Sequence, residues 1–139
     1  MTREQIEARI ASVHEIAPGT ICDLIKFQVI SVENDTCTLR CNTEFWMRNT
    51  IGILHGGIGV TILDHAMSLV AHCVKKGEGV TPAIEMQVSF HRPIMPCEEV
   101  DVVVHALSVS KSLIRLSAEA RQNQKLCISS SGTYFQKAE

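Results

Sequence analysis

Apolar residues near the N-terminus follow a helical spacing. They recur every three or four positions, at Ile6, Ile10, Val13 and Ala17. Because a helix turns once in about 3.6 residues, this spacing places them on one face, and Pro18-Gly19 interrupts the pattern. We predict an amphipathic helix over residues 2–16.

The next segments have the composition of β-strands. Residues 21–32 and 36–43 are rich in β-branched side chains, and Glu33-Asn34-Asp35 between them is a turn signal, so we predict a hairpin. Residues 44–54 show no clear period and are predicted to form a loop that carries Asn49 and Gly52. Its large apolar residues either line a pocket or, as is commoner before a buried helix, join the core: Phe45, Trp46 and Met47.

The segment from His55 to about Lys76 is the most apolar in the chain. Its apolar residues point to nearly every side of a helix: Val60, Ile62, Leu63, Ala66, Met67, Leu69, Val70, Ala71, Cys73 and Val74. A helix that is apolar all round is buried on most sides. We predict such a helix here, ended by Gly77-Glu78-Gly79.

Alternation of apolar and polar residues dominates the C-terminal half. The apolar members of two such runs are Ile84, Met86, Val88 and Phe90, and then Ile114, Leu116, Ala118 and Ala120. This alternation predicts strands with one buried and one exposed face. Three or four of them after the buried helix indicate an α+β fold in which an antiparallel meander wraps one helix. The length suits one domain over residues 1–139.

Composition narrows the class of protein. The chain is 45% hydrophobic and 20% charged, and its 13 Lys and Arg residues are dispersed. With a formal net charge of −2, it lacks the basic stripe that nucleic acid binding needs. The N-terminal segment lacks the apolar core of a signal peptide, and no segment is predicted to span a membrane. We expect a cytoplasmic protein.

The cysteine and histidine spacings do not indicate a metal site. The six cysteines are expected to be free thiols in a reducing compartment, and Cys37 and Cys41 are interpreted as core residues. His65 and His72 share a helical face but have no third ligand in phase with them. No metal and no cofactor is predicted.

Residues suited to chemistry gather between Asn49 and Asp64. Gly56 and Gly57 open the buried helix, where unpaired N–H groups and the helix dipole favour a negative charge. This helix end is suited to an oxyanion. Taken alone, however, two glycines at such a place more often only relieve crowding between a helix and a sheet.

Asp64 lies among apolar residues of the same predicted helix. A carboxylate is costly to bury unless it is paired or faces a cleft. Two interpretations carry equal weight from the residues alone. The carboxylate is either a base or nucleophile in catalysis, or it lies in a solvated crack or an internal salt bridge.

His55 and Asn49 also have two interpretations each. His55 either donates to a ligand or caps the helix, and capping is the commoner role. Asn49 either orients a carbonyl or a water through its amide, or it forms a turn. Nine residues separate His55 from Asp64, which puts them on opposite helix faces, so we expect no contact between them within one chain.

Taken together, these residues resemble the active-site signature of a known family. The pattern N-x-x-G-x-x-H-G-G over residues 49–57, followed after six residues by Asp64, is similar to that of hotdog-fold thioesterases of the phenylacetate-degradation (PaaI-like) type. Phe90-His91-Arg92-Pro93 resembles the family's aromatic-x-Arg-Pro strand end. The order of elements from about residue 20 to 136 also agrees.

The resemblance implies a hotdog fold that hydrolyses acyl-CoA, as a dimer joined by edge strands and commonly assembled as a tetramer. It implies a site shared between two protomers. Asp64 of one protomer would be the base or nucleophile, while the other protomer would supply Asn49, His55 and Gly56. The Gly56 N–H would polarise the thioester carbonyl, and Gly57 would belong to the same substrate-binding element.

One position departs from the family pattern. Several relatives carry a hydroxyl residue on the strand that faces the Asp. This chain aligns Ala83 there, at a position expected to bind substrate. Thr81 lies nearby, and its hydroxyl either replaces the missing one or does not. The candidate cations for the CoA phosphates are Arg92, Lys111 and Arg115. Each of these three also has an ordinary interpretation as a solvated surface charge.

Three other functions compete with acyl-CoA hydrolysis. An acyl-thioester dehydratase usually pairs a His with an acid in a different motif, which we do not find. A non-catalytic module that binds or senses acyl-CoA would keep the pocket and dispense with the carboxylate, so Asp64 counts against it. A purely structural oligomer needs neither Asp64 nor the His-Gly-Gly opening. The preferred acyl group and the role of Asp64 as nucleophile or base stay open.

Overall fold

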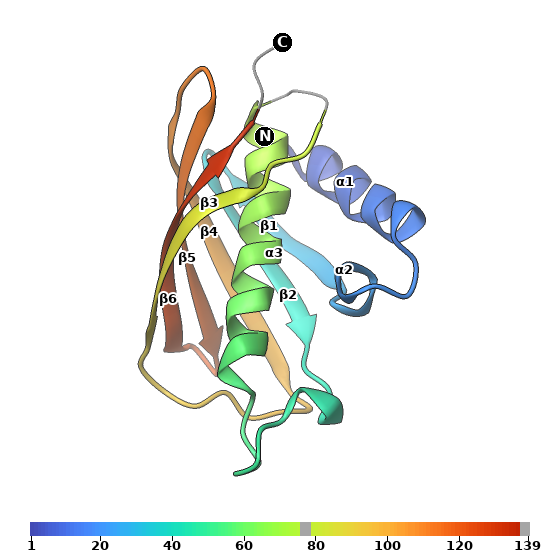
Figure 1. Cartoon of the computed structure of the whole chain (residues 1–139), viewed down its shortest axis with the longest axis vertical. Coiled ribbons are helices and arrows are strands. Elements are labelled where there is room, and N and C mark those ends of the chain that lie inside the picture. The colour runs from blue at the N-terminus through green and yellow to red at the C-terminus, as the bar shows by residue number, and fades with distance from the viewer. Residues whose placement is uncertain (76–78, 137–139) are drawn as a thin grey trace.

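A six-stranded antiparallel sheet curves around one long helix in the computed structural model, which describes residues 1–75 and 79–136 (Figure 1). The helices are α1 (Arg3–Ile16), α2 (Ile21–Leu24) and α3 (Gly56–Lys75), with a 3-10 turn, η1 (Phe45–Met47), before α3. The strands are β1 (Phe27–Glu33), β2 (Thr36–Asn42), β3 (Ala83–Phe90), β4 (Glu99–Val109), β5 (Leu113–Gln122) and β6 (Lys125–Phe135). The α+β prediction of one sheet around one helix is confirmed.

The strand order in the sheet is β1-β2-β4-β5-β6-β3. The meander prediction holds for β4, β5 and β6, but it was wrong for β3, which pairs with β6 at the far edge and not with β4. Residues 91–98 cross the end of the sheet between β3 and β4 (Figure 1). Alternation reports which face of a strand is buried and carries no information on its neighbour, so sequence reasoning could not place β3.

The predicted N-terminal helix is α1, and its start follows the expected capping chemistry. The Thr2 hydroxyl accepts the Gln5 N–H, and the Gln5 side chain accepts the Thr2 N–H, which together make a capping box. Ile6 is fully buried. The guanidinium of Arg3 donates to the carbonyls of Val29 and Ile30 at 2.9 and 2.7 Å, which ties α1 to β1.

The prediction of strand from residue 21 was wrong for the first six residues, because Ile21–Leu24 form the one-turn helix α2. The Asp23 carboxylate accepts the Gly19 N–H at 2.8 Å and contacts Nδ1 of His14 at 2.8 Å. The Gly19 bond, followed by that of His14, holds the pKa of Asp23 below its usual value. These local bonds turn the chain before β1, and the hairpin then follows as predicted, with Asn34 at a φ of 54°.

The long apolar helix α3 is the centre of the core. Its inward residues are almost without exposed surface, among them Ile62, Leu63, Ala66, Met67 and Val70. By length and composition α3 would also qualify as a membrane span, so the expectation that no segment does was wrong. Here its apolar residues pack against the sheet and α1. The described part of the helix ends at Lys75; the predicted stop signal begins at Gly77-Glu78, and these two residues lie outside the described residues.

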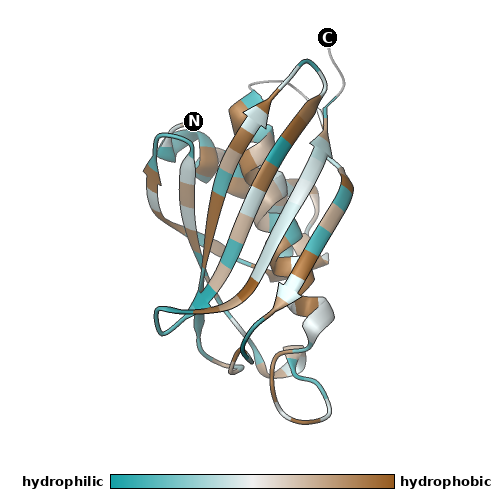
Figure 2. Ribbon diagram, turned by 90° about the vertical axis from the view of Figure 1, so that its left-hand side faces the viewer, coloured by the Kyte–Doolittle hydropathy of each residue, from teal (hydrophilic) through white to brown (hydrophobic). Residues whose placement is uncertain are grey.

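Buried apolar residues alternate with more exposed positions in β4 and β5, as their sequences predict (Figure 2). The same prediction was wrong for β3, where Ile84 and Phe90 are each 57% exposed because β3 lies at the edge of the sheet. Val100, Val102 and Val104 of β4 have no exposed surface. Cys37 and Cys41 of β2 are buried core residues, as predicted, and all six cysteines are free thiols. Burial raises the pKa of both the Cys37 and the Cys41 thiol to about 12.

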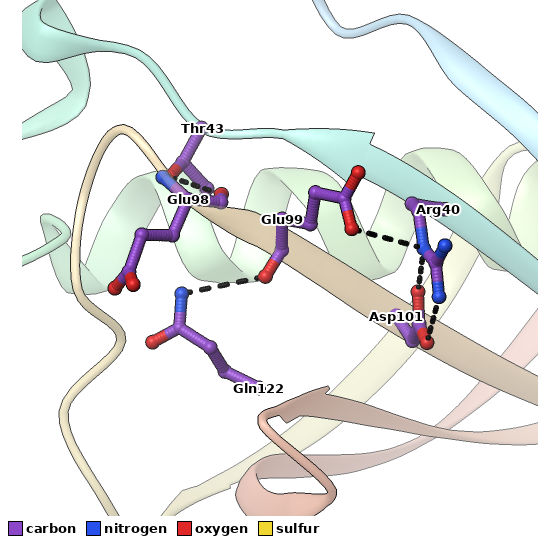
Figure 3. Close-up of polar contacts among 6 residues, drawn as sticks. All are labelled: Arg40, Thr43, Glu98, Glu99, Asp101 and Gln122. Atoms are coloured by element: carbon purple, nitrogen blue, oxygen red, sulfur yellow. Dashed lines mark hydrogen bonds and ion pairs between the residues drawn. The ribbon is translucent and has the colours of Figure 1, made fainter.

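Residues 91–98 are held against the end of the sheet by two buried polar side chains. Gln122 accepts the Met95 N–H at 2.7 Å and donates to the Met95 carbonyl at 2.9 Å. The Thr43 hydroxyl donates to the Glu98 carbonyl at 2.9 Å and accepts the Glu98 N–H at 3.2 Å (Figure 3). This connection is therefore fixed in position where it passes the N-terminal end of α3.

Candidate active site

Two loops meet at the N-terminal end of α3 (Figure 1). They border an open cavity of about 440 Å³. The Leu54 N–H donates to the Ile94 carbonyl at 2.9 Å, and the His55 N–H donates to the Met47 carbonyl at 2.8 Å. Four residues predicted from the sequence line this cavity: Asn49, His55, Gly56 and Arg92. Its apolar wall includes Leu54, Phe90, Pro93, Ile94 and Ile128.

His55 caps α3, which was the commoner of its two predicted roles. Its Nδ1 accepts the Gly57 N–H at 3.0 Å, and its carbonyl accepts the N–H groups of Ile58 and Gly59. Because Nδ1 is an acceptor, the neutral ring carries its proton on Nε2 and keeps a donor for a ligand. The Gly56 N–H has no acceptor among the described residues, so one backbone donor stays available in the cavity wall.

The two glycines at the helix start differ in what a side chain would meet. A β-carbon on Gly57 would lie 3.1 Å from Nδ1 of His55, so Gly57 makes room for the cap. A β-carbon on Gly56 would lie 3.4 Å from the Phe90 ring, which is ordinary contact distance. Gly57 therefore relieves crowding with the adjacent His55 side chain and not between helix and sheet, while Gly56 borders the cavity through its backbone.

Asn49 is both a turn former and a cavity residue. Its Oδ1 accepts the N–H groups of Ile51 and Ile53 at 3.0 and 3.2 Å, which fixes the turn that contains Gly52 at a φ of 84°. The side-chain oxygen is thereby occupied, and the amide NH₂ is the part of Asn49 that can donate to a ligand.

Asp64 does not line this cavity. It borders a second cavity of about 160 Å³ between α2 and α3, whose other residues are Ile21, Cys22, Ile25, Thr61, His65 and Ser68. The prediction that one chain does not bring His55 and Asp64 together is consistent with this separation. One protomer therefore presents the donor group and the carboxylate in two different places.

The Asp64 carboxylate accepts a hydrogen bond from Tyr134, a residue that sequence reasoning missed. The distance from the Tyr134 hydroxyl to Oδ1 is 2.7 Å, and the Tyr134 side chain is fully buried. Burial, followed by the bond to Asp64, raises the pKa of Tyr134. The available signal was the single tyrosine of the chain within a strand, because a buried tyrosine hydroxyl needs a partner.

The two positions weighed for a hydroxyl opposite Asp64 do not supply it. Ala83 begins β3 and pairs with Tyr134. The Thr81 hydroxyl is buried and donates to the Ser68 carbonyl at 3.2 Å, with the Ser68 hydroxyl at 3.3 Å. Thr81 is thus engaged with Ser68, and it is Tyr134 that provides the hydroxyl at the carboxylate.

The three candidate cations are not brought together within one chain. Arg92 lines the larger cavity, where its Nη1 donates to the Leu126 carbonyl at 3.2 Å. Arg115 pairs with Thr133, and Lys111 lies in the turn before β5, both toward the opposite end of the sheet from Leu126. Only Arg92 therefore shares a cavity with Asn49 and Gly56 in the same protomer.

The aromatic residues before α3 are not core residues, although Met47 is. Met47 is 1% exposed, but Phe45 and Trp46 are 66% and 46% exposed, so the core interpretation was wrong for these two. Arg48 stacks over the Phe45 ring with its Cζ 3.4 Å from the centroid, a cation–π contact at the surface.

Comparison with known proteins places this arrangement in a family. The model of the thioesterase superfamily matches residues 51–128, which hold the helix start, Asp64 and the Arg92 loop. This chain belongs to the thioesterase superfamily. It is a thioester hydrolase by class, and its fold is the hotdog fold of PaaI-like thioesterases.

Individual relatives agree with the family assignment. The chain is 26% identical to acyl-coenzyme A thioesterase 13 of Mus musculus over 103 residues, or 73% of this chain and 72% of that protein. Zebra fish thioesterase superfamily member 2 superposes with a TM-score of 0.83 at 18% identity, covering 99% of both chains. A phenylacetic acid degradation-related protein of Ralstonia eutropha JMP134 has a TM-score of 0.80 at 14% identity, covering 92% of this chain and 98% of that one.

Proposed function

We propose that this protein hydrolyses acyl-CoA thioesters in a site formed across a dimer, with the donor groups from one protomer and Asp64 from its partner. The observation that carries the proposal is the separation of two complementary halves. The free Gly56 N–H lies in one cavity with Asn49 and His55, while Asp64 borders another cavity. A second copy of the chain that brings its Asp64 to the cavity with these donor groups would complete the site.

The free edge of β3 supports this mode of dimerisation. Within residues 1–75 and 79–136, β3 has a neighbouring strand on one side only, and an uncovered strand edge readily pairs with another. Its apolar residues Ile84 and Phe90 are each 57% exposed, and Phe90 borders the cavity beside Gly56. A partner strand along this edge would shield them and bring the partner's helix to the cavity mouth.

Further association into a tetramer, and a cytoplasmic location, are also part of the proposal. Leu107 and Val109 of β4 are 62% and 49% exposed, and a dimer through β3 would leave this apolar surface uncovered. The free state of all six thiols is compatible with a reducing compartment.

The chemistry follows from the groups that the dimer would bring together. The Gly56 N–H, at the positive end of α3, would donate to the thioester oxygen as it gains negative charge, with the Asn49 amide as a second donor. In the general-base route, Asp64 takes a proton from water as the water oxygen bonds to the carbonyl carbon. The C–S bond then breaks, and the CoA thiolate leaves with the proton that Asp64 took up. In the nucleophilic route, a carboxylate oxygen of Asp64 attacks the carbonyl carbon, the C–S bond breaks to release the CoA thiolate, and water then cleaves the resulting acyl–aspartyl anhydride.

Arg92 is proposed as a contact for a CoA phosphate, because its guanidinium borders the same cavity as Asn49. Lys111 and Arg115 lie toward the other end of the sheet. They would serve this role only when contributed by a second protomer.

The deciding experiment measures thiol release from a panel of acyl-CoAs by wild type, by Asp64→Asn and by Asp101→Asn. Asp101 is a matched control, since its carboxylate pairs with Arg40 on the outer face of the sheet at 2.7 Å (Figure 3). We expect Asp64→Asn to lower kcat by at least about 10²-fold with Asp101→Asn near wild type. Absence of wild-type turnover together with measurable acyl-CoA binding would instead identify a binding or sensing module.

A single turnover in ¹⁸O-labelled water separates the two routes for Asp64. Direct attack by water places ¹⁸O in the released acid in the first turnover. An acyl–aspartyl intermediate that opens by attack of water on the aspartyl carbonyl leaves the first product unlabelled and puts ¹⁸O into Asp64.

A further inference from the structure

Among the described residues, the Asp64 carboxylate has one side-chain hydrogen-bond partner, and it comes from the opposite layer of the fold. The Tyr134 hydroxyl reaches from β6 to Oδ1 of Asp64 on α3 at 2.7 Å. It also lies 3.3 Å from the Asp64 backbone carbonyl. A hydroxyl carries one proton, and the shorter contact to a charged acceptor takes it, so the donor is directed at Oδ1.

The other hydroxyl groups around Asp64 are engaged elsewhere. Thr61 donates to the Gly57 carbonyl at 2.8 Å. The Ser68 and Thr81 side chains bond to each other and to neighbouring carbonyls. The hydroxyl of Tyr134 is therefore the one that contacts the carboxylate within the described part of the chain.

The position of Tyr134 is fixed by the sheet on both sides. Its backbone pairs with Ile114 of β5 and with Ala83 of β3, and its side chain has no exposed surface. The hydroxyl is thus held by two strands and not by a flexible surface chain. Such a donor can fix the direction of a carboxylate that itself lies at a cavity.

We propose that Tyr134 is a positioning residue for hydrolysis: it holds Oδ1 of Asp64 and leaves Oδ2 as the oxygen that meets water or the thioester. This role rests on the function proposed above for Asp64. Asp64 borders the cavity between α2 and α3, and its Oδ2 has no hydrogen-bond donor among the described residues, which leaves this oxygen available to a reactant. Burial keeps the Tyr134 hydroxyl protonated, because it raises the pKa of that group.

The same bond has a consequence for the pH dependence of the reaction. A donor to the ionised carboxylate favours that form, so removing it makes the carboxylate easier to protonate. Two titratable side chains line the same cavity, Cys22 of α2 and His65 of α3, and His14 and Arg9 of α1 act on His65. All four are unchanged in Tyr134→Phe. If substitution of Tyr134 shifts the acidic limb of the pH–kcat profile, the shift is therefore attributable to the lost hydroxyl.

The test compares wild type, Tyr134→Phe and the control Thr133→Val for acyl-CoA hydrolysis between pH 4 and 9. Thr133 precedes Tyr134 on β6, and its hydroxyl bonds to Glu85 on the other face of the sheet. We expect Tyr134→Phe to lower kcat roughly 10- to 100-fold with KM almost unchanged. The acidic limb of its pH–kcat profile should move to higher pH, while Thr133→Val keeps both kcat and the position of that limb. An unshifted limb in folded Tyr134→Phe would overturn the positioning role.

A second readout does not depend on activity. In protein labelled with ¹³C at the aspartate carboxyl carbons, the Asp64 signal is identified by its loss in Asp64→Asn. Its titration midpoint should be higher in Tyr134→Phe than in wild type, and equal midpoints would overturn the contact itself. If wild type cleaves no thioester, the proposed function fails and the catalytic role of Tyr134 fails with it, while the midpoints show separately whether the hydrogen bond exists.

Discussion

Nδ1 of His55 accepts the backbone N–H of Gly57 at 3.0 Å, and this bond gives the side chain two duties at once. Nδ1 stabilises the first turn of α3, and His55 also lines the cavity together with Gly56. The two duties can be separated by substitution, because an asparagine caps helices well but lacks the imidazole.

Substitution of His55 by alanine or by asparagine should separate the effect of this residue on stability from its effect on activity. His55→Ala loses the cap and should destabilise the fold by about 1 kcal/mol, whereas His55→Asn should stay close to wild type in denaturant unfolding. Both variants lack the Nε2 donor, and both should lose kcat/KM for acyl-CoA hydrolysis. Full activity in His55→Asn would show that His55 serves the helix alone.

Mixed dimers test whether the site is shared. Asp64→Asn and Asn49→Ala should each have low activity alone, but in a heterodimer one site unites the intact Asp64 of one chain with the intact Asn49 of the other. Random assortment makes half of the dimers mixed, each with one intact site in two, so coexpression should restore about a quarter of wild-type activity. Inactive mixtures, with heterodimers verified by mass spectrometry, would place both residues in one protomer's site.

Stability should fall as the pH drops below the ordinary histidine range. Burial lowers the pKa of His65, whose ring stacks on Phe27 at 5.4 Å between centroids. The unfolded chain then binds the proton more tightly than the folded chain, so stability is fully present above the unfolded pKa of 6.5 and declines below it. His65→Phe keeps an aromatic ring without the titration, so its Tm should depend less on pH between 5.5 and 8. His72, whose pKa is also lowered by burial, should retain part of the slope.

Thiol reactivity should follow burial. Cys97 is exposed, while Cys37 and Cys41 are buried and have pKa values raised to about 12, so almost none of either is ionised at pH 8. A chromogenic disulfide reagent should react rapidly with Cys97, and this phase should be absent from Cys97→Ser. Cys37 and Cys41 should react only as the protein unfolds. Rapid labelling of these two in the folded protein, located by peptide mapping, would contradict their placement in the core.

Much of the architecture could be predicted because its causes are local. The spacing around Ile6 defines α1, the apolar run after His55 defines α3, and alternation defines the buried faces of the later strands. That Asn49, His55 and Gly56 share one cavity was also predictable. They lie within eight consecutive residues, so turn and capping chemistry brings them close together.

The tertiary structure decided the contacts between distant segments, and it also corrected one local prediction. Residues 21–24 form a helical turn with Asp23 bonded to Gly19 and His14, and strand propensity does not report these local bonds. The place of β3 beside β6 followed from the path of residues 91–98, and it determines which strand edge is free for a partner. Tyr134 meets Asp64 across 70 positions of sequence, because strand order and register fix that distance whereas hydrophobic periodicity fixes only which way each side chain faces.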